Sequence, residues 1–500
     1  MIYVKLSNHS FWYDVYNIIR MFFKRDEIIL SEHEDHEDYE NNECKECNMV
    51  NTTIIKDKSI IVNLTVDISK TKKELSRQVY NALQQYTGKQ MPWGMLTGVR
   101  PVKIAYEMME EGMDSKKVLK KLENYYFIKT EKASLACKVA KTEMKILKNN
   151  MKDMVSLYIG IPFCKTRCQY CSFTSNCIDK NAHLVQKYLE SLKREICIVN
   201  REIIKNKALK IQTIYIGGGT PTSVNKEQLA DLLQFIEETL DLQYMEEYTL
   251  EAGRPDTIDK EKLLAIKNSR VNRISINPQT MNQETLNAIG RNHTPEQLKE
   301  SYYLARKIGF ENINMDVIVG LPGENIHMFE HTIREIQNMN PESLTVHSLA
   351  VKRASKLKEK LDKIYSNLDA GAGVNVDINN DMSEDREGLI DLASDEAASA
   401  MADMAYNYAI SMGMHPYYLY RQKNITGNLE NVGYSKPGFE SIYNIQIMEE
   451  KQTIIAFGAG AVTKVVYPEE NRLERAFNVK NLEDYINRAE EMVNRKKKLF

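Results

Sequence analysis

Residues 155–171 read Val-Ser-Leu-Tyr-Ile-Gly-Ile-Pro-Phe-Cys-Lys-Thr-Arg-Cys-Gln-Tyr-Cys, and this stretch decides the fold. Its first part, 156–161, is rich in apolar and β-branched residues and predicts a strand. Cys164, Cys168 and Cys171 follow at once in a CxxxCxxC pattern. Three thiols in one short loop of a long chain indicate metal ligation in preference to disulfides.

The sequence after this loop alternates short β-rich runs with amphipathic helical patterns, for example at 184–200 and 226–240. This alternation predicts repeated βα units around a parallel sheet. Six such units predict an α/β fold in the form of a partial (β/α)6 TIM-like barrel. The expected strands are 156–161, 213–216, 248–251, 273–276, 313–319 and 343–349.

Four regions are expected along the chain. Residues 1–150 predict an N-terminal α+β module, with strands at 2–6 and 60–66 and a helix at 12–23. Residues 151–355 hold the barrel, and the Gly-, Asn- and Asp-rich composition of 356–390 predicts a flexible insertion. Residues 391–500 form the expected C-terminal accessory domain, with a strand at 452–457 and a basic run at 495–498 on a solvated helix.

An acidic segment, 31–47, interrupts the N-terminal module and has almost no apolar residues. Such a segment cannot bury a core, and we expect a mobile loop. Cys44 and Cys47 lie at its end, but two cysteines without further ligands nearby are insufficient for a metal site.

The charge and hydropathy of the chain argue against a nucleic-acid-binding protein and against a membrane-spanning one. Lys and Arg total 67 against 69 for Asp and Glu, so no strong field attracts nucleic acid. No run approaches the roughly 20 apolar residues that a membrane helix needs. The start of the chain has no export signal, and a cytoplasmic location is expected.

The three-cysteine loop fits an oxygen-sensitive [4Fe-4S] cluster. Three thiolates leave one iron of such a cluster without a protein ligand. That iron can chelate the amino and carboxylate groups of S-adenosylmethionine (SAM), which then yields a 5′-deoxyadenosyl radical after one-electron reduction. A zinc knuckle completed by another Cys or His is the alternative reading of the spacing alone.

Further polar and glycine residues follow the ends of the expected strands, where parallel barrels carry their active sites. The second strand ends in Gly217-Gly-Gly-Thr-Pro-Thr222, whose glycines let the backbone approach a ligand. Glu251 ends the third strand, Gln279 follows the fourth and Asp316 lies in the fifth. Several such residues at matching strand ends predict one shared pocket.

These motifs together resemble the oxygen-independent coproporphyrinogen III oxidase (coproporphyrinogen dehydrogenase) family of radical SAM enzymes. The likeness rests on the Tyr158 to Cys171 loop, the Gly-Gly-Gly-Thr-Pro-Thr turn, Gln279, and Asp316 with its following Gly-Leu-Pro-Gly. It covers 155 to about 350 well. The Trp-Gly-Met-Leu-Thr-Gly-Val-Arg-Pro run at 93–101 resembles the subgroup with a long N-terminal extension.

The resemblance implies a radical SAM barrel, a [4Fe-4S] cluster on Cys164, Cys168 and Cys171, and SAM at one or two positions. The SAM contacts that it implies are Tyr158, Tyr170, Gly218, Gly219, Thr220, Glu251, Gln279, Arg291, Asp316, Ala350 and Val462.

Two features depart from the oxidases of this family. Phe173 stands where such oxidases tend to have another Cys, and Cys171-Ser-Phe-Thr-Ser175 is closer to the haem-chaperone branch. That branch has a His-Asn-x-x-Tyr-Trp signature, whereas this chain has Glu430-Asn-Val-Gly-Tyr-Ser435. These departures do not change the expected cluster ligands, but they leave the identity of the substrate open.

The resemblance implies oxidative decarboxylation of the propionates of coproporphyrinogen III to vinyl groups, giving protoporphyrinogen IX in haem biosynthesis. Arg353, Arg421 and Lys423 are candidate clamps for the substrate carboxylates, because charge-assisted pairs fix orientation. A low-potential donor such as flavodoxin or ferredoxin is the expected partner of a monomer. The alternatives are a haem-binding chaperone or trafficking protein, and a radical SAM enzyme with another substrate.

Overall fold

The computed structural model describes the whole chain except residues 24–25, 31–48, 70, 72, 174, 353–354, 358, 360–391, 423–424 and 471. The described residues divide into two compact units, Met1–Ala140 and Lys141–Phe500. The acidic segment with Cys44 and Cys47, most of the expected insertion, Arg353 and Lys423 lie outside the described residues.

The first unit is an α+β module. Its four strands lie in the order β2 (Ile28–Leu30), β1 (Ile2–Leu6), β3 (Met49–Lys56) and β4 (Ser59–Asp67). Strand β1 alternates buried and exposed residues, as a sheet with one covered face requires. The helices are α1 (Trp12–Phe22), α2 (Lys73–Thr87), α3 (Val102–Glu110), α4 (Ser115–Asn124) and the start of α5 (Thr130–Leu147). The expected strands at 2–6 and 60–66 and the helix at 12–23 are confirmed.

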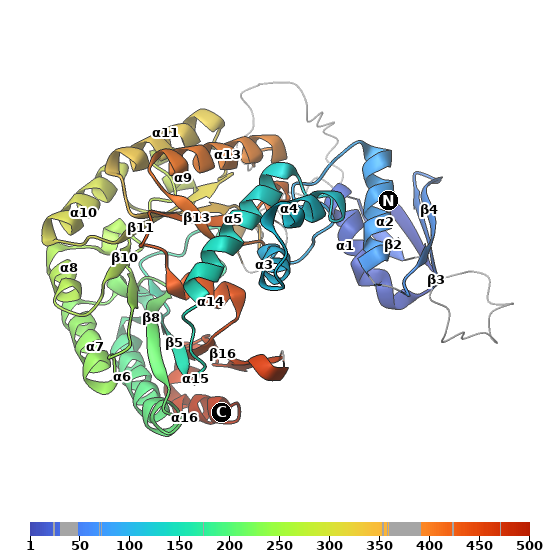
Figure 1. The fold of residues 1–500 in the computed structure, drawn as a ribbon. Helices are drawn as coiled ribbons and strands as arrows, with labels where there is room; N and C mark the ends of the chain where they lie inside the picture. The colour runs from blue at the N-terminus through green and yellow to red at the C-terminus, as the bar shows by residue number, and fades with distance from the viewer. Residues whose placement is uncertain are drawn as a thin grey trace. The chain divides into compact units, whose positions relative to one another are not determined.

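The second unit is built on six parallel neighbouring strands. They are β5 (Met154–Ile161), β8 (Lys210–Gly218), β9 (Glu247–Glu251), β10 (Arg273–Ser275), β11 (Ile313–Val319) and β12 (Ser343–Ser348). All six expected strands of the partial barrel are therefore confirmed. Figure 1 shows the helices between them following one another along the outside of the strands: α6 (Ala182–Val199), α7 (Lys226–Thr239), α8 (Lys260–Lys267), α10 (Pro295–Ile308) and α11 (Ile326–Met339).

The C-terminal region extends this sheet at both edges. Strands β14 (Asn431–Ser435) and β13 (His415–Tyr420) add antiparallel beyond β12. On the other side β15 (Thr453–Phe457) pairs parallel with β5, followed by antiparallel β16 (Val462–Tyr467) and β17 (Arg472–Phe477). The region thus protects both edges of the six-stranded sheet from unwanted pairing. Its helices are α13 (Asp395–Ser411), α14 (Ile442–Glu449), α15 (Leu482–Asn487) and α16 (Ala489–Lys497).

The expectation of a solvated basic tail is wrong for Lys496. This lysine lies on α16 and is fully buried, with its Nζ 2.6 Å from Oε1 of Glu195 on α6 and 2.7 Å from Oδ1 of Asn478. The hydroxyl of Tyr485 donates to the other oxygen of Glu195. The last helix is therefore fixed to the barrel by a buried polar cluster.

Among the described helices, none combines the length and the hydrophobicity that crossing a bilayer requires.

Candidate functional site

The carboxyl ends of the parallel strands open onto one cavity of about 540 Å³ in the second unit. This is the end of a parallel barrel at which active sites are found. The expected site residues that line it are Cys164, Cys168, Cys171, Tyr158, Tyr170, Gly218, Gly219, Thr220, Glu251, Gln279, Arg291, Asp316 and Ala350. Val462 begins β16 and is not among the lining residues, and neither is Arg421.

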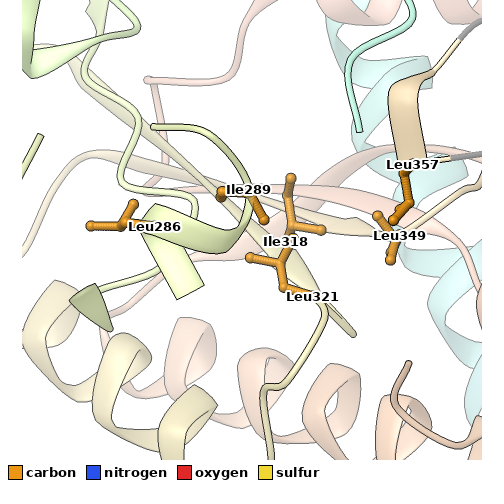
Figure 2. Close-up of a cluster of buried hydrophobic side chains, with 6 residues drawn as sticks. All are labelled: Leu286, Ile289, Ile318, Leu321, Leu349 and Leu357. Atoms are coloured by element: carbon orange, nitrogen blue, oxygen red, sulfur yellow. The ribbon is translucent and has the colours of Figure 1, made fainter. Parts of the chain in front are cut away.

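The cysteine loop is held in place by backbone hydrogen bonds to two other segments. Gln169 N donates to the carbonyl of Ile289 at 3.0 Å, and Leu357 N donates to the carbonyl of Gln169 at 2.9 Å. Figure 2 shows Ile289 and Leu357 within a cluster of buried apolar side chains. Tyr170 of the loop packs against this cluster, which consists of Leu286, Ile289, Ile318, Leu321, Leu349 and Leu357. The core of the barrel therefore supports the loop directly.

Two of the three cysteines have thiols that resist ionisation without a metal. Burial raises the pKa of Cys164 to about 11, partly offset by its contact with Thr220 Oγ1 at 3.5 Å. Burial also raises the pKa of Cys171. Thiolate ligation at these positions therefore depends on the metal itself, because a bound metal displaces the thiol proton. In the described part of the chain, no three Cys, His, Asp or Glu side chains are grouped around a point where one metal ion could bind. A [4Fe-4S] cluster does not require such a group, because each of its thiolate ligands binds a different iron.

The glycine turn after β8 is packed so closely that side chains would not fit. A Cβ on Gly217 would lie 2.9 Å from the carboxyl group of Glu251, and one on Gly219 would lie 2.5 Å from the carbonyl oxygen of Phe163. Gly218 has a φ of +102°, in the region that favours glycine. The turn therefore presents bare backbone to the cavity beside Glu251.

Glu251 is a partly buried carboxyl group whose pKa is raised to about 7, mainly by desolvation in the cavity wall and also by nearby Asp316. The hydroxyl of Tyr215 donates a hydrogen bond to its Oε1. Tyr215 in turn stacks on Tyr443 of α14, with ring centroids 4.5 Å apart. Glu251 is thus poised to gain a negative charge near neutral pH when a cation enters the cavity.

Asp316 keeps its charge although its side chain is only 21% exposed. Burial alone would raise its pKa, but hydrogen bonds and the nearby His347 lower it below the usual value. Asn314 Nδ2 donates to Oδ1 at 2.7 Å, and Nε2 of His347 lies 3.8 Å from Oδ2. The other ring nitrogen of His347 lies 3.3 Å from the hydroxyl of Tyr420 on β13. The C-terminal region therefore contributes one wall of the cavity.

Several buried polar atoms in the cavity wall lack partners among the described residues: Oε1 of Gln279, Oδ1 of Asn277 and Nε of Arg291. Gln279 has a φ of +65°, fixed by hydrogen bonds that its backbone makes with Asp316 and Ile318. Unpartnered buried polar atoms and non-glycine residues with positive φ cluster at ligand sites. The wall is therefore shaped for a polar ligand.

Comparison with known proteins agrees with this geometry. The family model of the radical SAM superfamily matches residues 158–336. The chain is 41% identical over 438 residues to the oxygen-independent coproporphyrinogen-III oxidase-like protein HemZ of Bacillus subtilis (strain 168), which covers 85% of this chain and 82% of HemZ. The chain belongs to this family of radical SAM proteins.

Other relatives point to a second branch. The heme chaperone HemW of Bacillus subtilis (strain 168) is 32% identical over 309 residues, or 62% of this chain and 70% of HemW. Among solved structures, coproporphyrinogen III oxidase HemN from Escherichia coli aligns at a TM-score of 0.49 and 20% sequence identity. The alignment covers 70% of this chain and 72% of the HemN chain.

Radical SAM proteins bind a [4Fe-4S] cluster and SAM, and the cavity of this family member fits both groups. Its cysteine loop supplies three thiols on one wall, which suits cluster ligation. The bare glycine backbone, Glu251 and the unpartnered oxygens of Gln279 and Asn277 supply acceptors for an amino group and a ribose.

The sequence interpretation did not identify Arg254, which also lines the cavity of this radical SAM protein. It is 2% exposed, and its Nη1 lies 2.9 Å from both the carbonyl oxygen and the Oγ1 of Thr166 and 3.9 Å from Sγ of Cys168. Asp256 accepts two hydrogen bonds from the same guanidinium at 3.0 and 2.9 Å. The signal was present, because Arg254 follows a strand end as closely as other predicted residues do.

His347, Tyr420, Tyr443 and Lys352 also line the cavity without having been predicted. Tyr420 and Tyr443 come from the C-terminal region, and their sequence surroundings carry no motif that predicts a place in the barrel mouth.

Proposed function

We propose that this radical SAM protein removes carboxyl groups from the propionates of coproporphyrinogen III without oxygen, leaving vinyl groups and giving protoporphyrinogen IX. The observation that carries the proposal is that the cysteine loop lines the same cavity as Lys352, a cation that has no carboxylate partner among the described residues. The family relationship to a coproporphyrinogen-III oxidase-like protein supports the same substrate class.

Cys164, Cys168 and Cys171 are the proposed cluster ligands. Gly218, Gly219 and Glu251 are proposed to receive the methionyl end of SAM, because bare backbone and a carboxyl group face the same space there. The remaining proposed SAM contacts are Tyr158, Tyr170, Thr220, Gln279, Arg291, Asp316 and Ala350.

The structure changes the choice of substrate clamp. Arg421 is buried beside Glu430, its Nη2 donates to the carbonyl of Asn428 at 3.3 Å, and burial lowers its pKa to about 10. It is not among the residues that line the cavity. Lys352 replaces it in the proposal, because its ammonium group lines the cavity 5.8 Å from the ring centre of Phe173 and pairs with no described carboxylate.

Phe173 adds an aromatic surface to this clamp. It lines the cavity and is 67% exposed, which is a large apolar area to leave in water. A ring next to a lysine suits a ligand that has both pyrrole rings and carboxylates. Phe173 and Lys352 therefore support a porphyrinogen at the cavity mouth.

When bound, the cluster and SAM would supply a 5′-deoxyadenosyl radical, able to take a hydrogen atom from the β-carbon of a propionate. Loss of CO2 from the substrate and of one electron to an acceptor would then leave the C=C bond of a vinyl group. Lys352 holds the propionate during these events, since a charge-assisted pair fixes its orientation. A low-potential protein such as flavodoxin or ferredoxin is the proposed electron donor, and a monomer is the proposed state.

A haem carrier is the second candidate function, because heme chaperone HemW proteins are among the relatives. Glu430 occupies the position of the haem-ligating His of that branch and is only 5% exposed, next to Arg421. A buried carboxyl group beside a guanidinium is a poor haem ligand, which disfavours this function.

Anaerobic incubation of the full-length, cluster-reconstituted protein with coproporphyrinogen III, SAM and dithionite tests the proposal. We expect 5′-deoxyadenosine and protoporphyrinogen together. Tight haem binding with neither product supports the carrier function, and deoxyadenosine without porphyrinogen turnover indicates another substrate.

A further inference from the structure

The buried ion pair of Arg254 and Asp256 lies next to one cysteine of the loop. Asp256 accepts from Nε and Nη2 of Arg254, which fixes the plane of the guanidinium. The two side chains are 3% and 7% exposed, so solvent screens them little. The remaining nitrogen, Nη1, faces Thr166 and Cys168.

Arg254 also connects the loop after β9 to the cysteine loop. Thr166 lies between Cys164 and Cys168 in the sequence, and both its carbonyl and its hydroxyl accept hydrogen bonds from Nη1 of Arg254. The Thr166 hydroxyl donates in turn to the carbonyl of Gly290 at 2.9 Å. The distance of 3.9 Å from Nη1 to Sγ of Cys168 is therefore set by a rigid frame and not by a mobile side chain.

A positive charge held this close to a cluster thiolate favours the reduced cluster, because reduction adds a negative charge. Hydrogen bonds to cluster sulfurs and the net charge around them are established determinants of iron–sulfur potentials. Asp256 has the opposite effect, since its carboxylate partly cancels the guanidinium charge. Arg291 also interacts with Cys168, so Arg254 is one of two cations near this thiol.

We propose that Arg254, oriented by Asp256, is a positioning residue that raises the reduction potential of the cluster through Cys168. The inference depends on Cys168 being a cluster ligand, and it does not depend on which substrate the enzyme uses. It predicts that removing the charge of Arg254 lowers the reduction potential of the cluster, and that removing the charge of Asp256 raises it.

The test is an anaerobic redox titration of the full-length reconstituted protein without SAM or substrate, followed by the electron paramagnetic resonance signal of the reduced cluster. Arg254→Gln removes the positive charge and should lower the midpoint potential. Asp256→Asn removes the negative charge and should raise it. We expect roughly a tenfold change in the one-electron reduction equilibrium for each, equivalent to about 59 mV.

Arg306→Gln is the matched control. Arg306 also pairs with a carboxylate through two close contacts, but its partner Glu342 precedes β12 and so lies at the end of the strands away from the cavity. The cluster of the Arg306→Gln protein should have the same midpoint potential as that of the unmodified protein. A general loosening of the fold would move all three variants in one direction, whereas the proposal requires opposite shifts.

Equal potentials in Arg254→Gln and Asp256→Asn, or shifts of the same sign, would overturn the proposal. If Arg254→Gln loses iron, Asp256→Asn decides alone: a higher potential supports the proposal, and an unchanged or lower one overturns it. If Cys168→Ser keeps a native cluster, the premise itself is wrong. None of these results depends on porphyrinogen turnover, so failure of the proposed reaction is recognised separately.

Discussion

Two buried ion pairs in the second unit have opposite designs. Lys496 and Glu195 are both fully buried, and every polar hydrogen of the ammonium group has an acceptor: Glu195, Asn478 and the carbonyl of Met492. Glu195 in turn accepts from Lys496, Asn478, Tyr485 and the backbone of Gly458. Arg254 and Asp256 are nearly as buried, but Nη1 of the arginine extends past its oxygen acceptors to a cysteine.

The difference shows how a buried charge serves stability in one place and chemistry in another. A carboxylate has about four lone-pair positions and an ammonium group three hydrogens, so the Lys496 cluster is complete and closed. The Arg254 pair also has its oxygen acceptors, Asp256 and Thr166, but it adds one further contact, from Nη1 to Sγ of Cys168. Burying a cation whose N–H group faces a thiol costs folding free energy. Its position at the cavity allows that N–H group to act on Cys168.

The largest expected effect on the free energy of unfolding is at the Lys496–Glu195 pair. Lys496→Met leaves the Glu195 carboxylate buried without its cation and should lower the free energy of unfolding by about 3–5 kcal/mol. Urea denaturation measures this loss. Lys497→Met, which removes an exposed neighbour on the same helix, is the control and should cost about 1 kcal/mol or less. Equal losses in the two variants would show that Lys496 does not close the C-terminal helix onto the barrel.

The next effect concerns Glu251, a partly buried carboxyl group of the cavity that forms no ion pair with the residues the structure describes. The pKa of Glu251 is raised to about 7, so the folded protein binds a proton more tightly than the unfolded chain does. Stability from this group is therefore full at low pH and is lost as the pH rises from about 4.5 to about 7. The loss is at most roughly 3–4 kcal/mol, because the shift is about 2.5 pKa units and each unit is 1.36 kcal/mol.

Glu251→Gln should abolish that part of the pH dependence. The titratable groups around Glu251 are unchanged in this variant; they are Tyr158, Tyr215, Arg273, Asp316 and Tyr443. Denaturation of both proteins at a series of pH values gives the difference curve. If the difference in unfolding free energy between the two proteins does not change between pH 4.5 and 7, the raised pKa of Glu251 is contradicted.

A smaller effect is expected at Lys352, the cavity cation that meets no carboxylate in the described part of the chain. Lys352→Gln should raise the KM for coproporphyrinogen about tenfold, or about 1.4 kcal/mol, with little change in unfolding free energy. Lys352→Arg keeps the charge and should restore most of the affinity. Anaerobic steady-state kinetics separate KM from kcat, and an unchanged KM in Lys352→Gln would remove this residue from the clamp.

The smallest effect belongs to a half-buried pair remote from the cavity. Arg306→Gln removes the ion pair with Glu342, whose side chains are 26% and 12% exposed, and should cost about 1 kcal/mol. SAM cleavage should stay at its normal rate. A loss as large as that of Lys496→Met would show that complete burial is not what separates the two pairs.

Local chemistry in the sequence was sufficient for the barrel and for one wall of its cavity. Apolar runs bounded by turns predicted six strands, and the cysteine spacing predicted the loop that follows the first. Glu251, Gln279 and Asp316 were predicted to share a pocket because carboxyl ends of parallel strands meet at one edge, and all three line the cavity. These features depend on contacts between neighbours in the chain or on one rule of topology.

Tertiary structure alone decided the rest. Tyr420 and Tyr443 enter the cavity because β13 and α14 return to the barrel from a distant part of the chain. Lys496 belongs to a basic run typical of solvated helices, and only packing against α6 shows that it is buried. Lys352 lines the cavity and Arg421 does not, for the same reason. Burial and direction of a charged side chain depend on neighbours far away in sequence, and no local pattern encodes them.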